Sequence, residues 1–300
     1  MNCVEAKLEL QQLLNKVSPS EVRKLLDWIK NSDELDHLLL DNNKVILQNI
    51  ADDLRARLPP DAMLPSETAA HHKMQQRARP TVHVDSFLYS DEQMDTLCEE
   101  GAMSRNYCLS CGSFRTAPLE FISHSFSATE LQFLFQNLLP DLSGRTLVDV
   151  GSRLGAVLYG GYVYSSASRL LGLELNEDFV RLQNDIVHKY KFSDRVQVLH
   201  ADVCTQEVLL NSTDVLIMNN VFEYFMESSE QVRAWMFIMK SFRKRGSLLV
   251  TVPSLHESLN ALQVVLQPGW VEELPVDYDV YLGKDTDPEA LRQIHLYRIL

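Results

Sequence analysis

Apolar residues in the second half of the chain gather in short runs that alternate with longer amphipathic stretches. The runs are rich in Leu, Val and Ile, which is typical of strands buried on both faces of a sheet, and the stretches between them repeat their apolar positions with a helical period. Short buried strands alternating with helices predict an α/β domain with a parallel, doubly wound sheet. The expected strands cover residues 145–150, 169–175, 195–200, 214–218 and 246–252, and the expected helices cover residues 154–165, 177–190 and 229–244.

The rest of the chain completes this organisation. A capping box at residues 18–21 starts one of several amphipathic helices in the N-terminal part, and Pro59-Pro60 ends the last of them. The expected divisions are an N-terminal helical unit at residues 1–58, a linker or irregular loop at 59–86, a cysteine-containing connecting segment at 87–126 and the sheet domain at 127–300. Shorter strands that finish the sheet are expected at residues 270–276, 280–283 and 294–299.

Composition and charge narrow the classes of protein. Of the 300 residues, 45% are hydrophobic and 23% are charged, as in a packed globular chain. The formal net charge of −13 disfavours nucleic acid as a partner, because an acidic surface repels phosphate backbones. No apolar run is long enough to span a membrane, and the first residues do not resemble a presequence. Five cysteines, an odd number, indicate reduced thiols, so we expect a cytoplasmic or nuclear protein.

The most informative segment follows the first expected strand, at residues 149–155, where a buried strand breaks into a glycine-bearing turn that opens a helix. The next expected strand ends at Glu174, whose carboxylate suits a ribose diol. A dinucleotide site would need a second glycine at Arg153, and Asp149 beside a pyrophosphate would be costly. Asp149 is attractive instead beside a ligand that carries an ammonium group.

Four segments in this order resemble the class I S-adenosylmethionine-dependent methyltransferases, over roughly residues 131–300. They are the turn at 149–155, the acid Glu174, the acidic turn at 200–203 and the strand with its mouth at 214–222. The resemblance implies a seven-stranded, Rossmann-like sheet that binds S-adenosylmethionine. It implies that the cofactor contacts Asp149, Gly151, Ser152, Gly155, Glu174, Asp202, Val203 and Asn219.

The mouth of the expected site carries Asn219-Asn220 followed by Phe222, which is similar to the mouth of the histone-lysine methyltransferases that lack a SET domain. Val221 stands where that family has Phe. The resemblance makes an amine, on a protein or a small molecule, a candidate acceptor. The candidate catalytic residues are Asn219, Asn220 and Tyr224, with Glu223 as a second group that could accept a proton. The alternative is that Phe222, Tyr224 and Phe225 only pack the following helix.

Arg153 departs from the family, which usually has glycine there. Its side chain either points away or pairs with the cofactor's carboxylate, in which case the protein is an enzyme, or it blocks the pocket. A blocked pocket would make the protein a catalytically inactive scaffold or adaptor.

Cys108 and Cys111 have the spacing of a zinc knuckle, in which two thiolates grip one metal ion. Cys98 and His124 are candidates to complete a Cys3His zinc site, although their spacing is not a familiar one. The alternative is a pair of thiols in a turn without metal.

Overall fold

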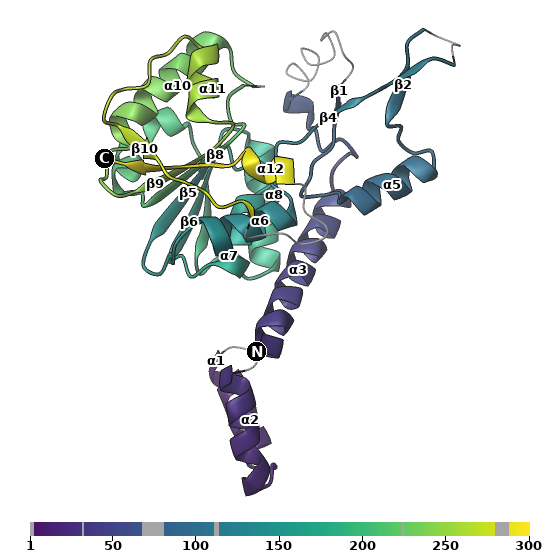
Figure 1. Ribbon diagram of the computed structural model, residues 1–300, viewed down its shortest axis with the longest axis vertical. Helices are drawn as coiled ribbons and strands as arrows, with labels where there is room; N and C mark the ends of the chain where they lie inside the picture. Colours follow the sequence, from purple (N-terminus) through teal and green to yellow (C-terminus); the bar gives the residue numbers. More distant parts are fainter. Residues whose placement is uncertain (1–2, 32, 68–80, 111–113, 224, 280–287) are drawn as a thin grey trace. The chain divides into compact units, whose positions relative to one another are not determined.

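The computed structural model describes residues 3–31, 33–67, 81–110, 114–223, 225–279 and 288–300. The chain divides into two compact units, Met1–Ile46 and Leu47–Leu300. The first unit contains α1 (Cys3–Leu14), α2 (Pro19–Asn31) and the first part of α3 (Asp33–Arg55), shown in purple in Figure 1. The division falls within α3, whereas the sequence places it after residue 58, because the last turns of this helix bury apolar side chains in the second unit. Those buried side chains are Leu47, Ile50, Ala51 and Leu54.

The segment that follows α3 is largely irregular, as its prolines predict, but parts of it are buried. Ala62 is fully buried, and η1 (Pro65–Glu67) buries the Glu67 side chain. Strand β1 (Thr81–His83) then pairs in parallel with β4 (Glu120–Ile122), outside the main sheet. Proline ends a helix but does not prevent an irregular segment from packing. The described part of residues 59–86 is therefore built into the second unit.

The cysteine-containing segment forms one helix and a hairpin. Helix α5 (Asp91–Glu99) begins at a capping box, in which Ser90 and Gln93 exchange side-chain and backbone hydrogen bonds. Strands β2 (Asn106–Cys108) and β3 (Thr116–Pro118) pair antiparallel and place Cys108 at the end of β2 next to the turn.

Within the described residues, seven strands form one mixed sheet in the order β10-β11-β9-β8-β5-β6-β7. The central strands are parallel, while β11 runs antiparallel to both of its neighbours. From β5 the chain turns first to β6 and β7 on one side and then to β8 and β9 on the other, so the edge between β5 and β8 is a topological switch point. The strands are β5 (Thr146–Val150), β6 (Arg169–Glu174), β7 (Val196–His200), β8 (Val215–Asn219), β9 (Leu248–Val252), β10 (Val271–Glu273) and β11 (His295–Ile299).

Helices cover both faces of this sheet (Figure 1). One group follows β5 and β6 and packs against β6 and β7, together with the helix that precedes the sheet. The other group consists of the helices that follow β7, β8 and β9 in sequence, and it covers the opposite face. The first group is α6 (Ala128–Phe133), α7 (Ala156–Tyr164) and α8 (Glu177–Lys189), and the second is α9 (Glu207–Ser212), α10 (Ser228–Ser241) and α11 (Leu255–Ala261). A short helix, α12 (Pro288–Arg292), precedes β11.

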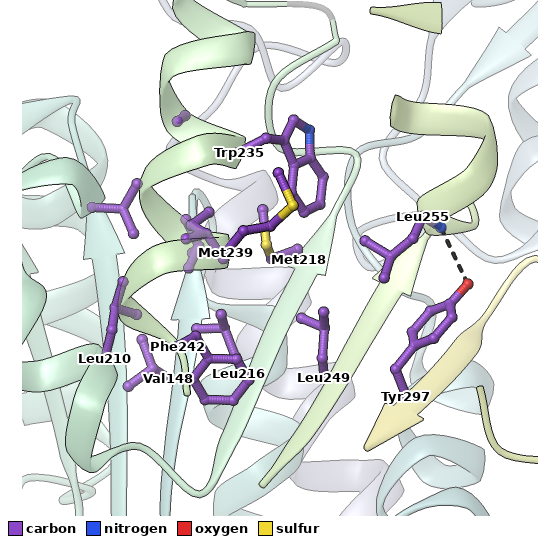
Figure 2. Close-up of a cluster of buried hydrophobic side chains, with 14 of the residues drawn as sticks. Val148, Leu210, Leu216, Met218, Trp235, Met239, Phe242, Leu249, Leu255 and Tyr297 are labelled. Carbon is purple, nitrogen blue, oxygen red and sulfur yellow. Dashed lines mark hydrogen bonds between the residues drawn. The ribbon is translucent and has the colours of Figure 1, made fainter. Parts of the chain in front are cut away.

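The core beneath α10 shows how the sheet is held (Figure 2). Val148, Leu216 and Leu249 come from three adjacent strands and point to the same face, where Trp235 and Met239 of α10 cover them. At the edge of this cluster, the Tyr297 hydroxyl accepts a hydrogen bond of 3.2 Å from the backbone N–H of Leu255. Each of these strands therefore contributes alternate residues to each of the two apolar layers, as a doubly wound sheet requires.

The α/β fold with a seven-stranded, Rossmann-like sheet and N-terminal helices is confirmed. The expected strands at 145–150, 169–175, 195–200, 214–218 and 246–252 correspond to β5 to β9 within one or two residues. The expected tail strands at 270–276 and 294–299 are β10 and β11, while the one at 280–283 lies outside the described residues. No helix in the described part of the chain is long and apolar enough to cross a membrane.

Candidate functional site

A cavity of about 280 Å³ opens at the carboxyl ends of the central strands. Residues that end or follow β5, β6, β7 and β8 form its walls, so it lies at the switch point of the sheet, where open α/β sheets bind their ligands. The segment after α3 adds Ser66 and Glu67, and the segment after β4 adds His124. The walls are formed mainly by Val150, Gly151, Arg153, Leu173, Glu174, Asn176, Phe179, Ala201, Asp202, Val203, Asn219, Asn220, Val221, Phe222 and Phe225.

Two glycines shape the turn between β5 and α7. Gly151 and Gly155 have φ angles of 69° and 86°, in the left-handed region that favours glycine. A Cβ atom on Gly151 would lie 3.0 Å from Cγ1 of Val221 in the cavity wall, and one on Gly155 would lie 2.6 Å from the Tyr159 hydroxyl. The turn therefore needs glycine at both positions, for its backbone conformation and for space.

Glu174 stands at the end of β6 with its carboxylate in the cavity wall. One oxygen accepts a hydrogen bond of 2.9 Å from the backbone N–H of Arg153, and the other accepts one of 2.8 Å from the backbone N–H of Asn176. Burial raises the pKa of this carboxyl, and these backbone donors lower it in part. A carboxylate offers about four acceptor positions, so Glu174 retains capacity for the hydroxyl groups of a ligand.

Three other predicted cofactor residues lie in different surroundings. Asp149 is buried within β5 and does not line the cavity; burial raises its pKa well above the usual range, and the nearby Glu174 adds to the shift. Asp202 lines the cavity and accepts a hydrogen bond of 2.8 Å from the backbone N–H of Cys204. The hydroxyl of Ser152 is buried against Gly172 and has no hydrogen-bond partner among the described residues, so this side chain faces β6 rather than the cavity.

The Arg153 side chain turns to acidic residues that are far away in the sequence. Its Nε donates a hydrogen bond of 3.1 Å to Glu67, and its Nη1 donates one of 3.0 Å to Asp85. Its Nη2 donates one of 2.6 Å to the backbone carbonyl of Ala62. The guanidinium also lies 5.1 Å from the centre of the Phe179 ring. Every nitrogen of the guanidinium thus has a partner within the protein, which supports the interpretation that this side chain does not project freely into the pocket.

The asparagine pair that the sequence singles out lines the cavity. The Asn220 amide donates a hydrogen bond of 3.1 Å to the side-chain oxygen of Asn219, whose own amide donates one of 3.4 Å to the backbone carbonyl of His124. Phe222 is buried and meets the Trp235 ring edge to face, as the packing alternative expects, although it also lines the cavity. Tyr224 lies outside the described residues.

Two buried histidines stand beside this end of the cavity. The rings of His83 and His124 stack with their centres 4.6 Å apart, and His124 meets the edge of Phe225 at 5.0 Å. Burial lowers the pKa of His124 to about 2, with further contributions from His83 and from the charge of Arg153. Burial and the Arg153 charge also lower the pKa of His83. His124 therefore presents a neutral imidazole to the cavity at neutral pH.

The predicted zinc site is not assembled in the described part of the chain. No group of three or more His, Cys, Asp or Glu side chains there is arranged to hold a metal ion. Cys108 is exposed at the end of β2, Cys98 is half-buried on α5, and His124 is stacked on His83 in the wall of the cavity. Cys111, the second residue of the knuckle, lies outside the described residues.

Comparisons with solved structures find methyltransferases at low sequence identity. A methyltransferase from Geobacter sulfurreducens is 16% identical, with 59% of this chain and 80% of that chain covered and a TM-score of 0.39. An RNA methyltransferase from Salinibacter ruber, solved with S-adenosylhomocysteine, is 12% identical, with 57% and 88% covered and a TM-score of 0.36. An N-methyltransferase from Haemonchus contortus, also with S-adenosylhomocysteine, is 18% identical, with 47% and 33% covered and a TM-score of 0.35.

No protein-family model matches the sequence, and no curated protein matches it. The superposition scores are low, so the fold is defined by the strand order and helix layers described above. The chain resembles the class I S-adenosylmethionine-dependent methyltransferases.

Some of the residues in and behind the cavity wall that the sequence did not single out come from segments before the sheet domain, and others, such as Asn176 and Phe179, come from the sheet domain itself. Glu67 and Ser66 lie in the predicted linker, and Asp85 and His83 follow or end a strand too short to be recognised. The sequence marks His124 only as a metal candidate. Glu67, Asp85 and Ala62 lie 68 to 91 residues before Arg153, the residue that they contact. No local sequence pattern therefore predicts these contacts.

Proposed function

We propose that this protein binds S-adenosylmethionine in the cavity and transfers its methyl group to an acceptor. The observation that carries the proposal is the position of Glu174, a buried carboxylate in the wall of a cavity at the switch point, directly beside a turn shaped by two positive-φ glycines. A carboxylate in that position accepts hydrogen bonds from a ribose diol.

The residues present fit the cofactor's chemistry. Glu174 and Asp202 provide acceptors on the wall formed by β6 and β7, while Leu173, Val203 and Phe179 provide apolar surface for a nucleoside base. The acidic groups outnumber the cationic ones in this wall, which suits a ligand with a sulfonium and an ammonium group. Gly151 lines the cavity and has no side chain, so a ligand can meet the backbone of the turn there.

The acceptor would enter at Asn219 and Asn220. When bound, the cofactor supplies a methyl group already activated on a sulfonium, so the protein's task is to orient the acceptor and exclude water. The amide oxygens of the asparagine pair can accept hydrogen bonds from an amine and orient its lone pair. The neutral imidazole of His124 adds a polar group that does not repel a cationic sulfonium. An amine on a protein or on a small molecule is the acceptor that we propose.

The second candidate function is a scaffold that has lost turnover, and the observation that favours it is Arg153 in place of the family's glycine. The pairing of its guanidinium with Glu67 and Asp85 weighs against a blocked pocket. We therefore favour the enzyme.

Equilibrium binding of S-adenosylmethionine and S-adenosylhomocysteine to the purified chain, measured by calorimetry, is the direct test. Stoichiometric binding of both would support the cofactor site, and radiolabelled methyl transfer to proteins or amines in a cell extract would then support catalysis. Binding without any transfer would favour the scaffold. Failure to bind either nucleoside would contradict the proposal.

A further inference from the structure

The buried charges around Arg153 do not balance. Its guanidinium carries one positive charge and forms ion pairs with two carboxylates, at 3.1 Å from Glu67 and 3.0 Å from Asp85. All three side chains are at most 8% exposed. The adjacent His83 supplies no compensating charge at neutral pH, because burial and Arg153 lower its pKa. The two carboxylates and the single guanidinium leave one negative charge that the network does not neutralise. A buried charge without a partner is costly.

The two carboxylates differ in their surroundings. Asp85 accepts hydrogen bonds from Arg153, from the Ser125 hydroxyl at 2.7 Å and from the backbone N–H of Phe87 at 3.0 Å, and it does not line the cavity. Glu67 accepts from Arg153 and from the backbone N–H of Leu64 at 3.0 Å, and it does line the cavity. The surplus negative charge is therefore presented to the cavity through Glu67.

Arg153 fixes the position of this carboxylate. Its backbone N–H donates to Glu174 in the cavity wall, while its side chain holds both Glu67 and the carbonyl of Ala62. A second contact holds the same segment, since the Asn176 amide donates to the Ser66 hydroxyl. The segment that bears Glu67 is thus attached to the glycine turn and to the start of α8.

We propose that Glu67 binds the ammonium group at the amino-acid end of the cofactor and that Arg153 is a positioning residue for Glu67. This inference rests on the proposed function. The sulfonium has no N–H or O–H to donate and the ribose hydroxyls are neutral, so the ammonium is the only donor of the cofactor that carries a positive charge. A carboxylate with free acceptor capacity and surplus negative charge therefore selects the ammonium. The same cation neutralises the surplus charge of the network. Arg153 then acts through Glu67 and not through a contact with the cofactor's carboxylate.

A thermodynamic cycle between residue and ligand tests this. Calorimetry would compare wild type and Glu67→Gln, each titrated with S-adenosylhomocysteine and with an analogue in which hydrogen replaces its amino group. We expect Glu67→Gln to lower the affinity for S-adenosylhomocysteine about tenfold or more and to change the affinity for the deaminated analogue less than twofold. Asp85→Asn, which removes the same charge away from the cavity wall, should weaken S-adenosylhomocysteine less than Glu67→Gln does.

Each result decides something. If Glu67→Gln lowers the affinity for both ligands equally, or lowers neither affinity, Glu67 does not bind the ammonium. The inference is then overturned while the cofactor site stands. If wild type binds neither nucleoside, the proposed function fails and this inference fails with it. Should Glu67→Gln not fold, as judged by circular dichroism, Glu67→Asp keeps the charge but withdraws it by one methylene. Glu67→Asp should then lower the affinity for S-adenosylhomocysteine more than the affinity for the deaminated analogue. Equal effects on the two affinities would overturn the inference.

Discussion

The backbone N–H of Arg153 donates a hydrogen bond of 2.9 Å to the carboxylate of Glu174, which links the turn after β5 to the end of β6. One residue thus serves two sets of acids: its backbone holds Glu174, and its side chain holds Glu67 and Asp85. The φ angle of 43° at Arg153 turns the chain so that both are reached. Arginine in this turn, where the family usually has glycine, leaves the acid on the next strand in place and connects it to a segment that precedes the sheet.

Glu174→Ala should weaken the binding of S-adenosylhomocysteine by roughly 1 to 3 kcal/mol, because the ligand loses hydrogen bonds to a charged acceptor. Calorimetry on the folded variant measures the change. Glu177→Ala, three residues later and exposed at the start of α8, is the matched control and should bind as wild type does. Unchanged affinity in Glu174→Ala would remove the ribose assignment.

Gly155→Ala should lower the free energy of unfolding by about 3 kcal/mol. Its φ of 86° strains any side chain, and the new Cβ would lie 2.6 Å from the hydroxyl of Tyr159, whose side chain is fully buried. Gly246 has a φ of 82° but nothing within 4 Å of the Cβ atom that alanine would add, so Gly246→Ala isolates the backbone strain and should cost about 1 kcal/mol. Urea denaturation of the two variants measures both losses of stability. Equal losses would show that the Tyr159 side chain moves to accommodate the new Cβ atom.

Arg153→Met should lower the free energy of unfolding by about 3 to 5 kcal/mol, because it leaves Glu67 and Asp85 buried without their cation. The matched control is Arg181→Met on α8. Arg181 pairs with Glu177 while both side chains are more than half exposed, so its loss should lower the free energy of unfolding far less than the loss of Arg153 does. Chemical denaturation distinguishes them, and a small loss in Arg153→Met would mean that the network contributes little.

The stability of wild type should fall between pH 7 and pH 5 by about 2 kcal/mol more than that of His124→Gln. Burial lowers the pKa of His124 to about 2 in the folded protein, whereas an unfolded histidine titrates near 6.5. Below that value the unfolded chain takes up a proton that the folded chain refuses, so the contribution of His124 to stability is present above pH 6.5 and is lost as the pH falls toward 2. Thermal or urea unfolding of both proteins at the two pH values measures this difference. If both proteins lose the same stability, the imidazole of His124 is protonated in the folded protein as well.

The central strands of the sheet were predictable because each is a short, mainly apolar run between polar segments, as in Thr146–Val150 and Val215–Asn219. Glu174 was predictable as well, since its place at the end of such a strand follows from the alternation of strand and helix. The antiparallel pairing of β10 with β11 and of β11 with β9 was not, because a short apolar run carries no sign of its direction.

The N-terminal contribution to the site could not be read from the sequence for a different reason. Glu67 lies among polar, proline-bearing residues that carry no helical or strand period, and Asp85 follows a strand of only three residues. Their counterion lies 86 and 68 residues later. Ser152 shows the converse: its place in the glycine turn suggested a ligand contact, but its hydroxyl lies against Gly172, a packing detail that spacing alone does not reveal.

The distance along the chain between Glu67 and Arg153 also has a consequence for synthesis. A ribosome releases Glu67 and Asp85 long before it releases the arginine that neutralises them, and β11, the last strand of the sheet, comes later still. During that interval the early segment has no partner for its acids and stays hydrated, because burying them unpaired would be costly. The cavity wall is therefore completed late during translation and folding. Nascent chains that end before residue 153 should lack a nucleoside site.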